Sequence, residues 1–393
     1  MSSPEPIMEQ ADKFIDPYVD ALVVAGAIRS QEVERAFRAV PRHHFISQIY
    51  LPPAGPNDRG FRKAPWNPSA PDVAHLSLIY SDSPLVTRLA DGMPMSSSSS
   101  PSLMAEMLEL LLIKPGSNIL EIGTATGFNA ALIAGIAGPA GRVVSVEIDP
   151  PTAEQARMAL TAYSNVSVLT GDGGERERLP KGEAFDKVIV TVGAADLSPA
   201  WVACLAPGGT ILVPLERGGS HALVTVGEES GQIRGKIVGW TGFVSGAGTL
   251  STGHPLRGLA MVPPSEMHEK SLRAGLGQGA WMRTMGVHAD EVDFYCYLSL
   301  IDERALWTPF GSGLVEGRAW AAAGQGMLRW TGGKHLAKDL ERAFGDWERL
   351  GRPSTADWLL EFHPTSTLPR KETRWWVRRR FYDWVFRLAA DCT

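Results

Sequence analysis

The stretch Leu120-Glu121-Ile122-Gly123-Thr124-Ala125-Thr126-Gly127-Phe128 decides how this chain folds. It completes Asn118–Ile122, which predicts a short buried strand, and it leads into Gly127–Ile136, whose small residues predict a helix. Glycines in such a turn let a ligand approach the backbone closely, and the start of the helix offers unpaired N–H groups. The stretch therefore predicts a ligand site where a strand turns into a helix.

The neighbouring sequence, from Ser96 to about Gly239, alternates apolar strands with helices. The predicted strands are Arg142–Ile148, Val166–Thr170, Asp186–Val192, Gly209–Leu215 and His221–Gly227. The predicted helices are Ser102–Ile113, Thr152–Ala162 and Pro199–Leu205. This alternation indicates an α/β fold of the Rossmann-like kind, a doubly wound and mostly parallel sheet with helices on both faces.

The chemistry of the turn favours S-adenosylmethionine as the ligand. Glu147, at the end of the next predicted strand, can accept hydrogen bonds from ribose hydroxyls. The glycines are spaced GxxxG rather than GxGxxG, and Ala125 stands between them. That loop leaves less room for a pyrophosphate than a dinucleotide-binding loop does, and Glu121 suits the cationic amino end of S-adenosylmethionine. A tight turn without a ligand stays open as the alternative.

A third acidic element follows the third predicted strand as Gly171-Asp172-Gly173. Asp172 is placed to accept a hydrogen bond from an adenine amino group, although an aspartate between glycines can also be an ordinary turn residue. The complete set of predicted cofactor-binding residues is Glu121, Gly123, Thr124, Ala125, Thr126, Gly127, Glu147, Ile148, Asp172, Gly173 and Thr191.

Composition excludes several other classes of protein. The 393 residues carry a formal net charge of −5, which argues against a nucleic-acid-binding surface over the whole chain. The three cysteines form no CxxC pair and the nine histidines show no metal-ligand spacing, so we expect no metal site and a reducing compartment. Without a signal-peptide pattern or a long apolar run, we expect a soluble cytoplasmic protein with no nucleic acid and no membrane as partner.

The flanking sequence is less regular and predicts three segments: 1–95, 96–239 and 240–393. In the first, Phe14–Val40 predicts two helices broken at Gly26, and Leu51–Met95 predicts mostly loop with one strand near Leu76–Tyr80. The last segment is expected to form an additional α+β domain. Its predicted strands are Glu291–Leu306 and Leu314–Arg329, with short helices, and its predicted amphipathic helix is Lys334–Leu350.

Several segments together resemble the protein-L-isoaspartate O-methyltransferase family. They are Val40-Pro41-Arg42-His43-His44-Phe45, Tyr80-Ser81-Asp82-Ser83-Pro84-Leu85, the serine run ending at Pro101, the 120–128 stretch, Gly171-Asp172-Gly173, Phe185–Thr191 and Leu205-Ala206-Pro207-Gly208-Gly209. The resemblance covers roughly residues 20 to 240. It implies a class I methyltransferase fold, S-adenosylmethionine as methyl donor, S-adenosylhomocysteine as product, and a carboxylate as acceptor.

The resemblance also implies which segment holds the substrate carboxylate. The family's serine-containing segment corresponds to Ser97-Ser98-Ser99-Ser100-Pro101, with the family's serine at Ser99, so the predicted catalytic residues are Ser99, Ser98 and Ser97. Ser100 suits the N-cap and Pro101 the first position of the following helix. Asp82 is open to two interpretations, a pocket residue or a turn residue, and His43 with His44 either shapes the entrance or forms a buried structural pair.

The chain continues well beyond the family's core, and this extension more loosely resembles family members associated with ribosomally synthesised peptides such as lanthipeptides and graspetides. The resemblance implies methylation of an aspartate in a modified, possibly pre-cyclised peptide, leading through a succinimide (aspartimide) to aspartimide or isoaspartate. The alternative is repair of isoaspartyl residues in damaged proteins, and a third hypothesis is a non-catalytic peptide-binding protein. We expect a monomer.

The basic, aromatic stretch Arg370–Trp384 near the C-terminus has three interpretations. It predicts a helix that caps the domain with its aromatic side chains in the core, or a docking surface for an acidic or macrocyclic peptide. The third interpretation, nucleic-acid binding, is disfavoured by the negative charge of the chain.

Overall fold

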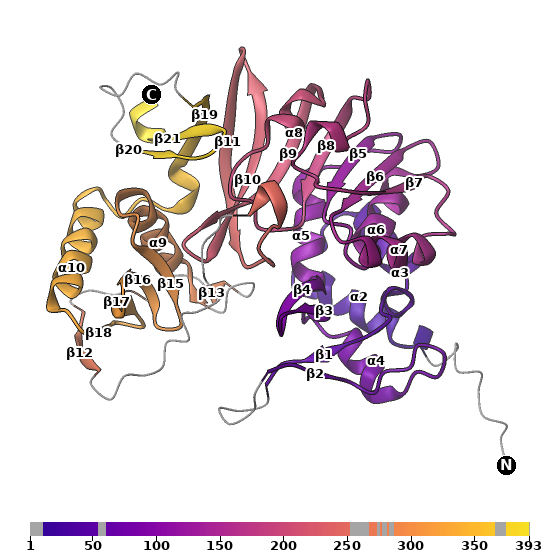
Figure 1. Ribbon diagram of the computed structural model, residues 1–393, viewed down its shortest axis with the longest axis horizontal. Helices are drawn as coiled ribbons and strands as arrows, with labels where there is room; N and C mark the ends of the chain where they lie inside the picture. The colour runs from indigo at the N-terminus through magenta and orange to yellow at the C-terminus, as the bar shows by residue number, and fades with distance from the viewer. Residues whose placement is uncertain are drawn as a thin grey trace. The chain divides into compact units, whose positions relative to one another are not determined.

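The computed structural model describes residues 11–53, 60–251, 267–272, 276, 281–282, 287–365 and 375–392. The chain forms two compact units (Figure 1). Unit 1 contains residues 1–191, 200–212 and 247–249, and unit 2 contains residues 192–199, 213–246 and 250–393. The three-segment division expected from the sequence stays a prediction.

Unit 1 is built on the predicted parallel sheet. Its strands, in spatial order, are β7 (Val166–Thr170), β6 (Arg142–Glu147), β5 (Asn118–Ile122), β8 (Phe185–Val190) and the first part of β9 (Leu205–Arg217). Ile122 pairs with Val146 of β6 and with Val190 of β8. The carboxyl ends of these three strands therefore lie side by side, which confirms the α/β prediction and brings the turns after β5, β6 and β8 to one edge.

The helices of unit 1 agree closely with the sequence pattern. They are α5 (Pro101–Leu111), α6 (Phe128–Ala137), α7 (Pro150–Ala159) and α8 (Pro199–Ala203). Asp149 caps α7 by accepting a hydrogen bond from the Thr152 backbone N–H, and a proline fits its first turn. Helix α6 is almost wholly buried, since it packs between the sheet and the N-terminal helix α3 (Gln31–Ala39), as Figure 1 shows.

The N-terminal part of unit 1 contains the two predicted helices, α2 (Ile15–Val24) and α3. Of the described residues in 51–95, the loop prediction is correct for 52–53, 60–61, 64–72, 81–84 and 91–92 and wrong for the strands and the helix between them. This region forms an antiparallel sheet of β2 (Arg62–Lys63), β1 (Tyr50–Leu51), β3 (Leu85–Ala90) and β4 (Met93–Ser98), in that spatial order. The tight β3–β4 turn is made by Asp91 and Gly92, which both have positive φ angles.

A helix, α4 (Val73–Ile79), replaces the strand predicted near Leu76–Tyr80. Its N-cap is Asp72, whose carboxylate accepts a hydrogen bond from the His75 backbone N–H. Leu76 and Ile79 are completely buried and lie three residues apart, on one face of the helix. The cap and this short apolar face outweigh the strand propensity of the segment.

Unit 2 contains the second part of β9 followed by antiparallel strands. Their spatial order after β9 is β10 (Ser220–Glu229), β11 (Gln232–Thr241), β19 (Trp358–Pro364), β21 (Tyr382–Leu388) and β20 (Trp375–Arg378). The helix predicted for the basic aromatic stretch is thus wrong for residues 375–384, while residues 370–374 lie outside the described residues. The same interpretation expected aromatic side chains of this stretch to enter the core, and this is correct for Trp375 and Trp384.

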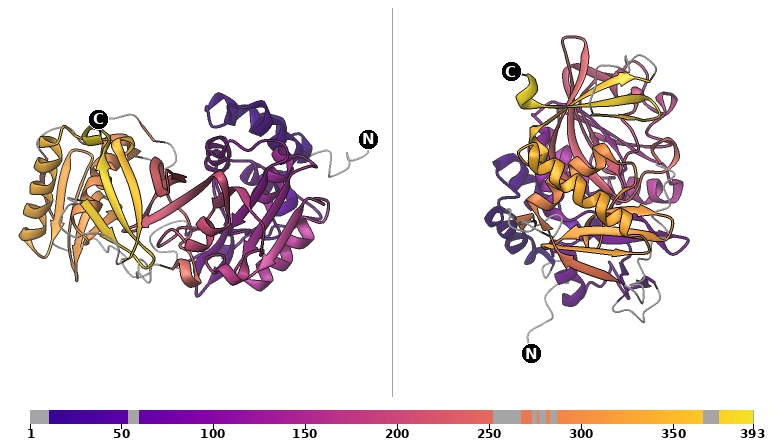
Figure 2. Two further views of the ribbon diagram at one scale, coloured as in Figure 1. Left: turned by 90° about the horizontal axis from the view of Figure 1, so that it is seen from above. Right: turned by 90° about the vertical axis from the view of Figure 1, so that its left-hand side faces the viewer.

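A second sheet of unit 2 has the order β12 (His268–Ser271), β18 (Met327–Thr331), β17 (Ala319–Gly324), β16 (Gly311–Glu316) and β15 (Ala305–Thr308). Helices α9 (Ala289–Ile301) and α10 (Lys334–Arg349) pack on it and on each other, and Figure 2 shows α10 lying alongside the strands. Helix α10 confirms its prediction, whereas the strand predicted from Glu291 is a helix as far as Ile301. A short pair, β13 (Trp281–Met282) and β14 (Val287–His288), precedes α9. Among the described residues, no helix is both long and apolar enough to span a membrane.

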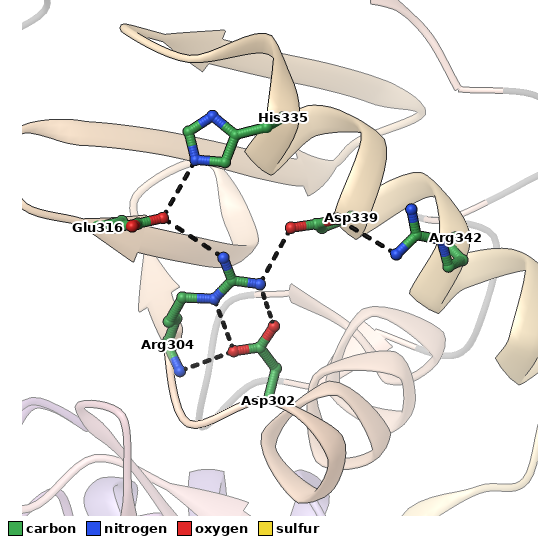
Figure 3. Close-up of polar contacts among 6 residues, drawn as sticks. All are labelled: Asp302, Arg304, Glu316, His335, Asp339 and Arg342. Carbon is green, nitrogen blue, oxygen red and sulfur yellow. Dashed lines mark hydrogen bonds and ion pairs between the residues drawn. The ribbon is translucent and has the colours of Figure 1, made fainter.

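A charged network holds α10 to the second sheet (Figure 3). The guanidinium of Arg304 contacts three carboxylates, those of Asp302 at 2.6 Å, Asp339 at 3.1 Å and Glu316 at 3.4 Å. His335 lies 3.1 Å from Glu316. Since Asp339 and His335 belong to α10 and Glu316 to β16, the network ties the helix to the strand.

A buried imidazole fixes the segment that follows β8 in unit 2. His221 is buried, and its Nδ1 accepts a hydrogen bond of 3.2 Å from the Phe243 backbone N–H. A Cβ atom added at Gly193 would lie only 1.9 Å from His221 Nε2. Burial lowers the pKa of His221 to about 4, so the ring is neutral at physiological pH.

Candidate functional site

The turn after β5 has the positive φ angles that its glycines allow, but the expected unpaired N–H groups are largely paired within the protein. The N–H groups of Gly123, Gly127 and Phe128 donate to Val146 O, Thr124 O and Thr126 Oγ1. Gly123, Ala125 and Gly127 have φ angles of 100°, 48° and 86°. The value for Ala125 lies in the left-handed region, which residues other than glycine seldom adopt. The Ala125 N–H donates a 2.9 Å hydrogen bond to Glu147 Oε2, and this bond holds the turn against the end of β6. The turn lies at the carboxyl edge of the sheet, where Gly123, Ala125 and Thr126 are half-buried and Thr124 and Gly127 are buried.

Glu121 is completely buried, and its carboxylate has partners within the protein. Ser145 Oγ donates a 2.5 Å hydrogen bond to Oε2, and Asn129 Nδ2 donates a 2.7 Å bond to Oε1. Burial, opposed by these two bonds, raises the pKa of Glu121 to about 7. Its contact with the amino end of a ligand stays a prediction. Ser145 and Asn129 carry no motif that predicts this contact, although a polar residue within an apolar strand was a signal for Ser145.

The other predicted cofactor residues near this turn also lie together. Glu147 accepts hydrogen bonds from the backbone N–H groups of Ala125 and Asp149, and burial raises its pKa. Thr191 Oγ1 donates to the carbonyl oxygens of Ile122 and Gly123, at 3.0 and 2.7 Å, so it secures the start of the turn. The Thr124 hydroxyl is buried 2.6 Å from Ser145 Oγ.

Asp172 and Gly173 complete this edge. Asp172 accepts hydrogen bonds from Gly174 and from Thr249, a residue that the sequence analysis did not select. A Cβ atom added at Gly173 would lie 2.7 Å from Ile122 Cγ2, so only glycine permits this approach to β5. Ile148 keeps 37 % of its surface exposed, so an apolar side chain is accessible beside the polar groups of this edge.

The predicted catalytic serines lie at the end of β4, where successive side chains point to opposite faces. Ser98 is buried, and its hydroxyl lies 3.3 Å from Arg42 Nε, which donates to it. Ser97 and Ser99 are half-buried. Ser98 therefore has a structural partner, whereas Ser97 and Ser99 retain accessible surface. The three serines do not all face the same side of the strand.

Ser100 occupies the N-cap position of α5, as predicted, but its side chain makes no capping hydrogen bond. Asp82 takes that part instead. Its carboxylate accepts hydrogen bonds from the Ser102 backbone N–H at 2.8 Å and from the Ser102 hydroxyl at 2.5 Å. This contact supports the structural interpretation of Asp82 and ties the 80–85 segment to the start of α5.

Arg42 organises the segments around the serine run, a role that the sequence analysis missed. Its guanidinium is completely buried and donates to five carbonyl oxygens. These belong to Ile79, Ser81, Ser83, Ser98 and Ser99, at 2.7 to 3.3 Å. The adjacent His43 is buried and bonded to the Tyr80 hydroxyl at 2.7 Å, which supports a structural role for it. The positive charge of Arg42 thus lies directly behind the backbone of Ser98 and Ser99.

An ion pair connects the β3–β4 hairpin to the cofactor edge. Arg88 of β3 lies 3.2 Å from Asp149, the residue that follows Glu147 and Ile148 after β6. The ion pair therefore joins the hairpin that leads into the serine run to the residue that follows Glu147 and Ile148. A tight glycine-containing turn, an acidic strand end and a hydroxyl-bearing segment together suit a nucleoside-containing ligand beside an anionic one.

Comparison with known proteins finds similarity to one enzyme family. The family model described as Protein-L-isoaspartate(D-aspartate) O-methyltransferase (PCMT) matches residues 71–250. The protein-L-isoaspartate O-methyltransferase 2 of Archaeoglobus fulgidus is 32 % identical over 217 residues, which cover 55 % of this chain and 84 % of that protein. The protein-L-isoaspartate O-methyltransferase of Pyrococcus horikoshii is 34 % identical over 232 residues, covering 58 % of this chain and 89 % of that protein.

A solved structure titled protein-L-isoaspartate O-methyltransferase has the same fold. It superimposes with a TM-score of 0.52 at 23 % sequence identity, covering 88 % of this chain and 95 % of that chain. This coverage exceeds what residues 1–250 alone could supply, so the likeness in fold reaches into the C-terminal region. The class I methyltransferase fold predicted from the sequence is confirmed.

Proposed function

The chain belongs to the protein-L-isoaspartate O-methyltransferase family, and from this premise we propose that it methylates the free carboxylate of isoaspartyl residues in proteins or peptides. The observation that best supports the proposal is the Arg88–Asp149 ion pair, because it joins the hairpin that leads into the serine run to the acidic end of β6. We therefore infer that a site for a nucleoside donor and a site for a carboxylate acceptor are neighbours.

The residues at this edge fit S-adenosylmethionine. The positive φ angles of Gly123, Ala125 and Gly127 shape a tight turn, and the exposed Ile148 offers an apolar surface for a base. Glu147 and Asp172 supply acceptors for ribose hydroxyls and for an adenine amino group. When bound, S-adenosylmethionine supplies an electrophilic methyl group on a sulfonium centre.

The acceptor side needs groups that orient a carboxylate without protonating it. Ser97 and Ser99 keep accessible surface, and their hydroxyls can donate hydrogen bonds to an anion. Arg42 places its charge behind the Ser99 carbonyl, 2.9 Å away, and so keeps the segment in one conformation. Because a carboxylate is already ionised near neutral pH, alignment is the main task of the protein, and such alignment can contribute roughly 7–11 kcal/mol.

The ester that results is activated toward attack by the following backbone nitrogen. That attack forms the succinimide ring and releases methanol. Water then opens the ring to aspartate or isoaspartate. These steps take place on the substrate and require no further group from the protein.

A second candidate is tailoring of an aspartate in a ribosomally synthesised, modified peptide of the lanthipeptide or graspetide kind. It is favoured by residues 251–393, which lie beyond the family match, and by the four serines Ser97–Ser100 in the carboxylate-binding segment. The solved structure weighs against it, since an isoaspartate methyltransferase shares the fold of part of that C-terminal region. Isoaspartyl methylation is therefore the better supported function.

The test is mass spectrometry of peptide pairs that differ only in an isoaspartyl or an ordinary aspartyl linkage, incubated with the full chain and S-adenosylmethionine. We expect one methyl group on the isoaspartyl peptide, followed by loss of methanol. Methylation confined to an aspartate of a cyclised precursor peptide would establish the second candidate. Binding of S-adenosylhomocysteine without methylation of any peptide would instead indicate a peptide-binding protein. The monomeric state and the cytoplasmic location stay predictions.

A further inference from the structure

A short turn far along the chain contacts the predicted adenine-binding residues. The 3-10 turn Gly248–Leu250 begins within residues 247–249, which belong to unit 1 although their neighbours in sequence belong to unit 2. Thr249 lies 77 residues after Asp172 in the sequence, yet its backbone and its side chain both reach that carboxylate. Nothing in the motif analysis selects this turn.

The hydrogen bonds of Asp172 leave one acceptor position open. Oδ1 accepts from the Gly174 N–H at 2.9 Å and from the Thr249 hydroxyl at 2.8 Å, and Oδ2 accepts from the Thr249 N–H at 2.7 Å. Each carboxylate oxygen can accept about two hydrogen bonds. The three donors therefore fix the plane of the carboxylate and leave capacity on Oδ2.

Gly248 packs closely against the same group. A Cβ atom at this position would lie 2.2 Å from Asp172 Oδ2 and 2.9 Å from Ile148 Cδ1, and its φ angle is +61°. A side chain at position 248 would therefore displace Asp172 and cover Ile148. With glycine at this position, Asp172 is half-buried and Ile148 keeps 37 % of its surface exposed.

We propose that Gly248 and Thr249 complete the adenine pocket and determine its specificity for a 6-amino purine. Thr249 is a positioning residue that orients the Asp172 carboxylate toward the amino group, and Gly248 keeps Oδ2 and Ile148 free for the base. This inference rests on the proposed function, since it takes S-adenosylmethionine as the ligand.

The test is calorimetric titration of the full chain with two ligands, S-adenosylhomocysteine and S-inosylhomocysteine, in which oxygen replaces the 6-amino group. The wild type should bind the adenine compound about tenfold or more tightly, because the 6-oxo group cannot donate to Asp172. Thr249→Val removes the hydroxyl donor but keeps the shape of the side chain. It should weaken S-adenosylhomocysteine about tenfold, change S-inosylhomocysteine little, and so abolish the preference.

Two further variants sharpen the result. Thr249→Ser keeps the hydroxyl and should keep the preference, whereas Gly248→Ala should reduce it, since the new methyl group meets Asp172. Thr161→Val is the matched control, because Thr161 is exposed at the end of α7 and donates only to backbone carbonyls. It should leave both affinities unchanged.

The affinity ratio does not depend on how much of a variant is folded. The inference would be overturned if Thr249→Val left the affinity ratio unchanged, which includes an equal loss of affinity for both ligands. Tighter binding of S-adenosylhomocysteine by Thr249→Val would also overturn it, because it would mean that Thr249 obstructs the pocket. Failure of the proposed function is distinguishable, since the wild type would then bind neither ligand or transfer no methyl group.

Discussion

Replacing Glu121 by glutamine tests how this carboxyl group affects stability. The group is completely buried, and its pKa is raised to about 7 from the ordinary value of 4.5. Between these two pH values the folded protein holds a proton that the unfolded chain has released. Stability therefore falls as the pH rises through this window, because the folded state binds more protons than the unfolded state. Glu121→Gln carries no charge at any pH and removes this loss.

The size of the effect follows from the same two pKa values. A difference of one pKa unit corresponds to about 1.36 kcal/mol, so the ionised carboxyl costs the folded state about 3 kcal/mol at pH 8 and less than about 1 kcal/mol at pH 5. Relative to the wild type, Glu121→Gln should thus gain about 2–3 kcal/mol between pH 5 and pH 8. Glu121→Gln also alters the hydrogen bonds to Ser145 and Asn129. This change shifts the unfolding free energy of the variant equally at pH 5 and at pH 8, so it cancels when the two pH values are compared.

The assay is urea unfolding of both proteins at pH 5 and pH 8, followed by circular dichroism. All other titrating groups are shared by the two proteins, so the wild type at each pH is the control. A difference in unfolding free energy that stays the same at the two pH values would refute the reasoning, because it would mean that Glu121 has no raised pKa in the folded protein.

Three further predictions concern other contacts. Arg42→Met should lower the free energy of unfolding, measured in urea, by about 3–5 kcal/mol, because it leaves buried carbonyls unpaired. A loss below about 1 kcal/mol would contradict the role of Arg42 as the organising residue. Ser99→Ala should raise KM for an isoaspartyl peptide without changing the affinity for S-adenosylhomocysteine. Ser98→Ala, its matched control, should mainly lower the melting temperature. Equal effects of the two variants on KM would contradict the assignment of Ser99 to the substrate and of Ser98 to the structure. Arg304→Met should lower the free energy of unfolding by about 1 kcal/mol at low ionic strength and by less in high salt, because the network of Arg304 is partly exposed. A loss of stability that does not depend on salt would contradict an electrostatic role.

The sheet of unit 1 was predictable because its signals are local. Apolar strands such as Val166–Thr170 and the turn around Gly123 each carry their pattern within a few residues. The cofactor residues after β5, β6 and β7 follow from this pattern, since the carboxyl ends of parallel strands share one edge of the sheet. Their contacts with a ligand stay predictions.

The features that could not be predicted from the sequence depend on contacts between residues that lie far apart in the chain. Helix α4 shows only two fully buried positions, too few to separate a helix from a strand by periodicity. The contact of Thr249 with Asp172 has no counterpart in local sequence. Arg42 was visible in its motif, but the five carbonyls that it binds come from segments 37 to 57 residues away. A buried arginine that binds backbone leaves no complementary acidic residue as a signal.

The close approach of His221 to Gly193 constrains how relatives of this protein can diverge. A methyl group at position 193 cannot coexist with the imidazole, because its carbon would overlap the ring nitrogen. Gly193 therefore cannot change first: its replacement by alanine becomes neutral only after position 221 has acquired a smaller or differently directed side chain. Among relatives with this C-terminal unit, residues 193 and 221 should vary as a pair, and the order of the two replacements on a phylogenetic tree should place the change at 221 first.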